Sequence, residues 1–84
     1  MIENDLLLDF ERFISDIVFC GINNIDISVI DKLMIFRDNL ISLEYLVELI
    51  DKLIFSIKKN DNTDIIDNLT KIDFYIQHYI VYSN

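Results

Sequence analysis

The segment 43–59 constrains the fold more than any other part of the chain, because its apolar residues recur with the period of an α-helix. At about 100° per residue, eight apolar side chains fall on one broad face: Leu43, Leu46, Val47, Leu49, Ile50, Leu53, Ile54 and Ile57. Charged residues occupy the opposite face. An apolar face of this width has to be buried, so the segment predicts a central helix in an all-α fold.

Three further segments carry the same helical period. The first helix is expected to start near Asn4 or Asp5 and to end at Cys20, because Gly21 stands where helices commonly stop. Its expected buried face consists of seven apolar residues: Leu6, Leu7, Phe10, Phe13, Ile14, Ile17 and Val18. One Gly and no Pro in the whole chain leave such long helices uninterrupted.

Hydroxyl side chains mark the expected starts of the second and third helices. The second helix follows the linker 22–27, and Ser28 with Asp31 three residues later resembles a capping box. The chain is expected to turn around residues 41–42, with Ser42 as the cap of the central helix.

The clearest loop covers residues 60–63, which are polar and lack periodicity, and the last helix is expected over 64–82. The second and last helices again carry single apolar stripes: Val29, Leu33, Phe36 and Leu40 on the second, and Ile65, Leu69, Ile72, Ile76 and Tyr79 on the last. Four amphipathic helices of this kind are best buried in a bundle.

An offset of 36 residues aligns the apolar positions of the first half with those of the second half without a gap. The match predicts two similar helical hairpins, 1–41 and 42–84, within one domain of residues 1–84. Few of the aligned residues are identical, so chance matching of two amphipathic hairpins is the alternative. In either case, the predicted fold is a small antiparallel four-helix bundle.

The chain carries 15 acidic and 7 basic residues, which gives a formal charge of −8. This charge disfavours nucleic acid and anionic lipid, because their phosphates are bound through lysine and arginine. It favours a protein partner with a basic surface, although acidity also keeps a chain with 52% hydrophobic residues soluble. No apolar run approaches the ~20 residues of a membrane span, and the N-terminus lacks a basic signal-peptide region. We therefore expect a cytoplasmic protein that contacts neither nucleic acid nor membrane.

Residue types suited to catalysis or metal binding are too sparse to form a constellation. His78 is the single histidine and shares a helical face with Asp64, Asp67 and Lys71, which predicts a solvated side chain. Cys20 is expected to be a small buried hydrophobe, because no His or Lys adjoins it to activate the thiol. The sequence therefore predicts no enzyme, no cofactor and no metal site.

Several apolar residues fall outside the four stripes and predict an interface, in particular a homodimer that buries the second and fourth helices. These residues are Ile30, Met34, Ile41, Phe74, Tyr75, Tyr79, Val81 and Tyr82. Ile30, Met34 and Ile41 would instead be core if the second helix is more central. Phe19 and Phe55 share one position of the 36-residue offset, and both are expected to pack under the loops that follow them.

Together these features predict a non-catalytic, acidic helical module that binds another protein and blocks or recruits it. Candidates are an inhibitor, an immunity-like or antitoxin-like protein, or a phage anti-defence protein. The composition, rich in Asn, Ile, Asp and Lys, fits an AT-rich bacterial or phage genome. The acidic residues expected to contact a basic partner, such as a nucleic-acid-processing enzyme, are Asp5, Asp9, Asp16, Glu44, Glu48 and Asp51.

Two alternative functions remain compatible with the same residues. The first is a scaffold subunit that works as an obligate homo-oligomer, in which the apolar residues outside the stripes matter more than the charge. The second is a small-ligand domain with a pocket between the hairpins, lined by Phe10, Phe36 and Tyr79.

Overall fold

In the computed structural model, the backbone is described for residues 2–21, 25 and 27–83, and the side chains for residues 5–21, 25 and 27–79. These ranges contain four helices and no strand, which confirms the predicted all-α class. The helices are α1 (Ile2–Cys20), α2 (Ile27–Asn39), α3 (Glu44–Lys59) and α4 (Asn62–Ser83).

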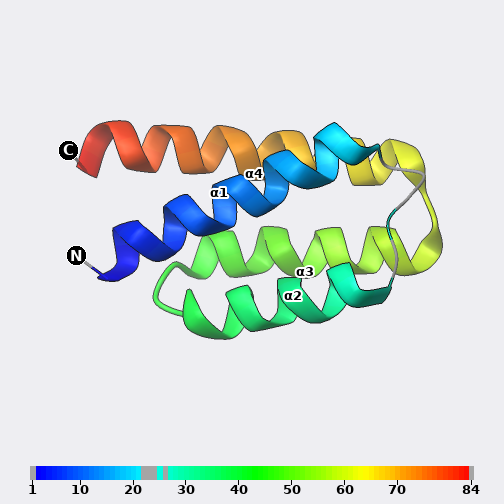
Figure 1. Cartoon of the computed structure of the whole chain (residues 1–84), viewed down its shortest axis with the longest axis horizontal. Coiled ribbons are helices and arrows are strands. Elements are labelled where there is room, and N and C mark those ends of the chain that lie inside the picture. Colours follow the sequence, from blue (N-terminus) through cyan, green and yellow to red (C-terminus); the bar gives the residue numbers. More distant parts are fainter. Residues whose placement is uncertain (1, 22–24, 26, 84) are drawn as a thin grey trace.

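Successive helices run antiparallel and form a bundle (Figure 1). Helix α3 packs against both α2 and α4, and α1 packs along α4. Aromatic side chains make the contact between α1 and α2. The ring centroid of Phe36 on α2 lies 5.0 Å from that of Phe10 and 5.5 Å from that of Phe13 on α1. Helices α2 and α4 therefore occupy opposite corners, and the predicted antiparallel four-helix bundle is confirmed.

The buried core follows the apolar stripes that the sequence predicts. Every residue predicted inward on α2, α3 and α4 is buried or half-buried. On α1 the exception is Val18, whose side chain is 59% exposed, so its predicted burial is wrong. Val18 lies at the edge of the α1 stripe, where its side chain lines a groove between α1 and α4.

Two predicted helix starts are wrong. Helix α1 begins at Ile2, ahead of Asn4 and Asp5, and α2 begins at Ile27, so that Ser28 lies inside its first turn. Each start lies further toward the N-terminus than the polar residue that suggested a cap, because helical hydrogen bonding does not require a capping side chain.

The predicted cap of the central helix is wrong as well. The N-cap residue of α3 is Leu43 rather than Ser42, and no side chain caps it. The turn is fixed by the backbone, because the Leu43 N–H donates to the Leu40 carbonyl at 2.9 Å. Leu40 is buried and Leu43 half-buried, so apolar packing sets the start of this helix.

The connection between α3 and α4 is shorter than the predicted loop 60–63. Asn60 adopts the left-handed conformation at φ 57°, which an asparagine tolerates well, and ends α3. Asp61 then caps α4, because its Oδ1 accepts the backbone N–H of Asp64 at 3.2 Å. The two-residue turn holds α3 and α4 antiparallel and in close contact.

A buried polar pair joins α3 to α4. The Asn68 side-chain amide donates to the Ser56 hydroxyl at 2.7 Å and approaches the Lys52 carbonyl at 3.4 Å. The Ser56 hydroxyl donates to the same carbonyl at 2.8 Å. Ser56 is 2% and Asn68 7% exposed, so the Ser56–Asn68 pair satisfies polar groups inside an otherwise apolar contact.

Burial agrees between many positions separated by 36 residues. Both members are buried in five such pairs: Phe10 and Leu46, Ile14 and Ile50, Ile17 and Leu53, Leu33 and Leu69, and Leu40 and Ile76. The halves differ at the Ser56–Asn68 pair, because the corresponding residues Cys20 and Lys32 are both exposed. A common origin of the two hairpins remains a prediction.

Candidate protein-interaction surface

All six acidic residues predicted to contact a partner are exposed, but they differ in their neighbours. Asp51 accepts a hydrogen bond from Arg37 Nη1 at 2.8 Å, and Glu48 lies 3.6 Å from the Nζ of Lys52, one helical turn further along α3. The other four make no ion pair within the described part of the chain: Asp5, Asp9, Asp16 and Glu44.

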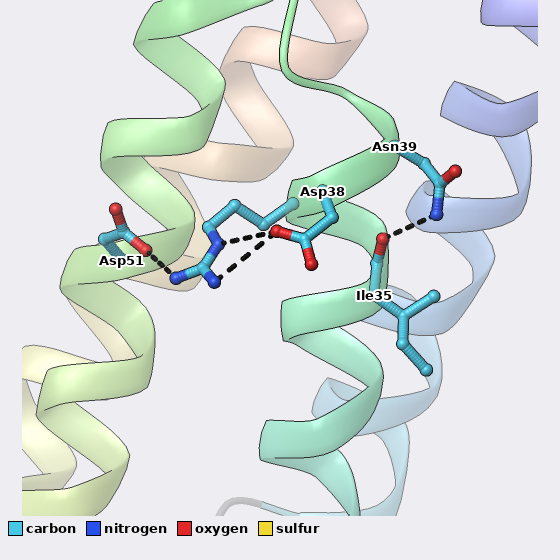
Figure 2. A network of polar contacts seen from close by, with 5 residues as sticks. Ile35, Asp38, Asn39 and Asp51 are labelled. Carbon is cyan, nitrogen blue, oxygen red and sulfur yellow. Dashed lines mark hydrogen bonds and ion pairs between the residues drawn. The ribbon is translucent and has the colours of Figure 1, made fainter.

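The basic residues that form ion pairs belong to α2, α3 and α4. Arg37 lies between Asp51 of α3 and Asp38 of α2, and Asp38 Oδ1 is 3.4 Å from Arg37 Nε (Figure 2). The hydrogen bond that Arg37 donates to Asp51 raises the pKa of Arg37, and the bond that Lys71 donates to Asp67 raises the pKa of Lys71. The remaining ion pairs are Lys59–Asp64 at 3.1 Å and Lys71–Asp67 at 2.9 Å.

Helix α1 carries a large share of the chain's negative charge. Its sequence holds five acidic residues and Arg12, a formal charge of −4 that is half of the chain's −8. None of its described carboxylates pairs with a cation, and Glu11 instead accepts the Gln77 side-chain amide at 3.0 Å. We call the described carboxylates the α1 carboxylates: Asp5, Asp9, Glu11 and Asp16.

The described residues of the predicted apolar interface belong to helices at opposite corners of the bundle, or to the turn after α2. Met34 and Ile41, from α2 and the turn after it, are exposed, and so is Phe74 on α4 at the opposite corner of the bundle. Ile30, Tyr75 and Tyr79 are half-buried. Val81 and Tyr82 belong to α4, but their side chains lie outside the described residues. The homodimer through α2 and α4 stays a prediction.

The described tyrosines of that interface form part of an aromatic row along the α3–α4 edge. The Tyr75 ring lies 5.5 Å from Tyr45 of α3 and 6.2 Å from Tyr79, between centroids. These contacts hold Tyr75 within the bundle edge, so its ring also serves the packing of this chain.

Three exposed residues correct the sequence-based expectations near helix ends. Phe19 is 94% and Phe55 61% exposed, so neither packs under the following loop. Cys20 is exposed as well rather than buried. Phe19 and Cys20 are the last two residues of α1, where the chain leaves the helix at Gly21 (φ 95°) and the outer face of α1 lies uncovered.

A groove of about 420 Å³ lies between α1 and α4, and no sequence pattern predicted it. Its lining is mainly apolar: Ile14, Ser15, Val18, Phe19, Ile66, Leu69, Thr70 and Asp73. Two exposed apolar residues could have indicated it, Phe19 on the charged side of its helix and Ile66 beside the α4 stripe. This groove is not the pocket that the sequence predicts between the two hairpins. At that predicted site the side chains fill the space, because Phe10 is wholly buried against Phe36.

The described residues form no cluster of acidic, His or Cys side chains that could hold a metal ion. His78 is exposed, as predicted; its ring lies 4.1 Å from the Phe74 ring and its Nδ1 lies 3.1 Å from the Phe74 carbonyl oxygen. None of the helices in the described ranges has the length and hydrophobicity to cross a membrane. The absence of catalysis remains a prediction.

Comparisons with known proteins find no matching protein family, no similar curated protein and no similar solved structure. Functional inference for this chain therefore depends on the chemistry of its own surface.

Proposed function

We propose that the protein is a non-catalytic, acidic interaction module that binds a basic protein surface through α1 and thereby blocks or recruits that partner. The observation that supports this most is the uneven distribution of charge. Ion pairs neutralise much of the surface of α2, α3 and α4, whereas the α1 carboxylates form no ion pair with any described residue. An uncompensated acidic helix attracts basic surfaces and accelerates association with them.

A basic nucleic-acid-processing enzyme is the partner class that fits this surface best. Such an enzyme binds phosphates through lysine and arginine, and the exposed Asp5, Asp9 and Asp16 of α1 present negative charge to the same groups. Binding would then compete with nucleic acid, as expected of an inhibitor, an immunity or antitoxin-like protein, or a phage anti-defence protein.

Neutralising α1 should weaken binding to a basic probe more than neutralising the ion-paired surface. We expect the triple substitution Asp5→Asn, Asp9→Asn and Asp16→Asn to lower the affinity for a fluorescent oligolysine peptide about tenfold at low salt. Fluorescence anisotropy measures the affinity. Binding of the wild-type chain should be lost near about 1 M salt, where the Debye length is about 3 Å.

A matched control separates the location of the charge from its amount. The substitutions Glu48→Gln, Asp51→Asn and Asp67→Asn also remove three negative charges, so both triple variants carry −5 instead of −8. The control should lower the affinity by about twofold or less, because these carboxylates already bind cations of this chain. Equal losses in the two variants, or binding that ignores salt, would contradict the proposed role of α1.

Exposed apolar residues favour a second candidate function, a scaffold subunit that works as an obligate homo-oligomer. Met34, Ile41 and Phe74 are all exposed, and such side chains are commonly covered in subunit contacts. If this holds, light scattering across a dilution series should show a dimer, and Met34→Asp with Phe74→Asp should give a folded monomer. A dimer that survives both substitutions, or a wild-type monomer at every concentration, counts against this function.

A further inference from the structure

We infer that the groove between α1 and α4 receives a short amphipathic helix of a partner protein, one that carries basic residues beside its apolar face. The inference rests on the proposed function and specifies how the partner is held. Three large apolar residues at the groove are strongly exposed: Val18 (59%), Phe19 (94%) and Ile66 (52%). Exposed aromatic and aliphatic side chains around a hollow are typical anchors of protein recognition.

The shape of the groove selects a helical segment of the partner. Its lining residues come from the stretches 14–19 of α1 and 66–73 of α4, and these two helices pack antiparallel side by side (Figure 1). The α4 stretch spans about 10 Å at about 1.5 Å per residue, which corresponds to about two helical turns. A helix laid between two helices would place apolar residues at i, i+3 or i+4, and i+7 into this hollow.

The described lining of the groove carries negative charge and no positive charge. Asp73 is the charged member of the lining, and it makes no ion pair with any described residue. Glu11 precedes Ser15 by about one turn of α1, and its bond from Gln77 bridges the two helices beyond the Asp73 end. Among the described residues, no lysine or arginine lines the groove, so a basic occupant would complement its charge.

The same charges disfavour a second copy of this chain as the occupant. The outer surface of a second α1 would bring the formal charge of −4 on that helix against Asp73 and Glu11. Like charges placed opposite one another across an interface oppose association. A basic amphipathic helix can pack its apolar face against the apolar lining while its basic residues contact the acidic residues of the site.

Synthetic peptides test the inference without knowledge of the natural partner. The probe is a labelled leucine–lysine–alanine peptide of about four helical turns with all leucines on one face, and the reference is a scrambled peptide of identical composition. We expect the amphipathic probe to bind at least tenfold more tightly in fluorescence anisotropy. Its NMR amide shift changes should centre on Ser15, Val18 and Thr70, which line the groove.

Paired substitutions locate the binding site. Phe19→Ser with Ile66→Ser should weaken binding of the amphipathic probe at least tenfold, whereas Phe55→Ser with Ile35→Ser should change it less than twofold. The two variants make the same chemical changes, and Phe55 and Ile35 are both 61% exposed outside the groove lining. Because all four residues are exposed, both variants should keep the wild-type helical circular dichroism.

The results separate failure of this inference from failure of the proposed function. Equal binding of the two peptides, or groove variants that bind like the wild type, would overturn the groove while leaving the oligolysine test of α1 intact. No binding of either peptide would overturn it as well. A wild-type dimer that the Phe19 and Ile66 substitutions convert to a monomer, without binding of the probe, would assign the groove to a second copy.

Discussion

Replacing Leu53 with alanine is expected to lower the free energy of unfolding by about 2–5 kcal/mol, because the smaller side chain leaves a cavity in a packed core. Leu53 is wholly buried on α3, the helix that packs against both α2 and α4. At about 0.05–0.15 kcal/mol per residue, a chain of this length is stable by about 4–13 kcal/mol in total. One substitution would therefore remove a large share of the stability.

Urea denaturation followed by circular dichroism measures this effect. Leu8→Ala supplies the control, since it removes the same atoms from a residue that is exposed on α1. We expect it to cost less than about 1 kcal/mol. Similar losses at Leu53 and Leu8 would mean that the stripe on α3 is not the packed centre of the bundle.

Replacing Asn68 with alanine should cost about 1–3 kcal/mol, because it breaks the buried Ser56–Asn68 pair between α3 and α4. Ser56 would keep its bond to the Lys52 carbonyl, so much of the loss reports the contact between the two helices. A double-mutant cycle with Ser56→Ala should give a coupling of about 0.5–3 kcal/mol, as measured for contacting residues.

An exposed amide provides the matched control for Asn68. Asn39 on α2 also donates its side-chain amide to a backbone carbonyl, that of Ile35 at 2.8 Å (Figure 2). Asn39→Ala should change stability by about 0.5 kcal/mol or less, because water replaces an exposed bond readily. A larger loss at Asn39 than at Asn68, or additive effects of Ser56→Ala and Asn68→Ala, would speak against a stabilising buried pair.

Apolar periodicity predicted the parts of the fold that depend on burial. The α3 stripe from Leu43 to Ile57 is buried or half-buried throughout, because an amphipathic helix has one way to hide its wide apolar face. Prediction failed at Val18 and Cys20, which lie near the end of α1. Burial there depends on whether a neighbouring element extends far enough to cover the residue, and local sequence holds no such information.

The sequence predicted which acidic residues of the candidate surface are exposed, but it did not predict which of them form ion pairs. The sequence located the exposed carboxylates, but it could not separate Asp51, which pairs with Arg37 fourteen residues away, from Asp9, which lacks such a partner. Pairing over that distance requires α2 and α3 to be placed side by side. The groove likewise exists because α1 packs on α4, two helices from opposite ends of the chain.

If α1 binds a partner, as proposed, the placement of the ion pairs has a consequence for how that partner could change over evolutionary time. Two of the pairs, Arg37–Asp51 and Lys59–Asp64, join α2 to α3 and α3 to α4, and none of the pairs involves a described side chain of α1. Exposed substitutions on α1 therefore break no salt link and cost little stability. The bundle can act as a constant frame on which one helix varies, so that a lineage of such proteins could follow a changing target through mutations confined to α1.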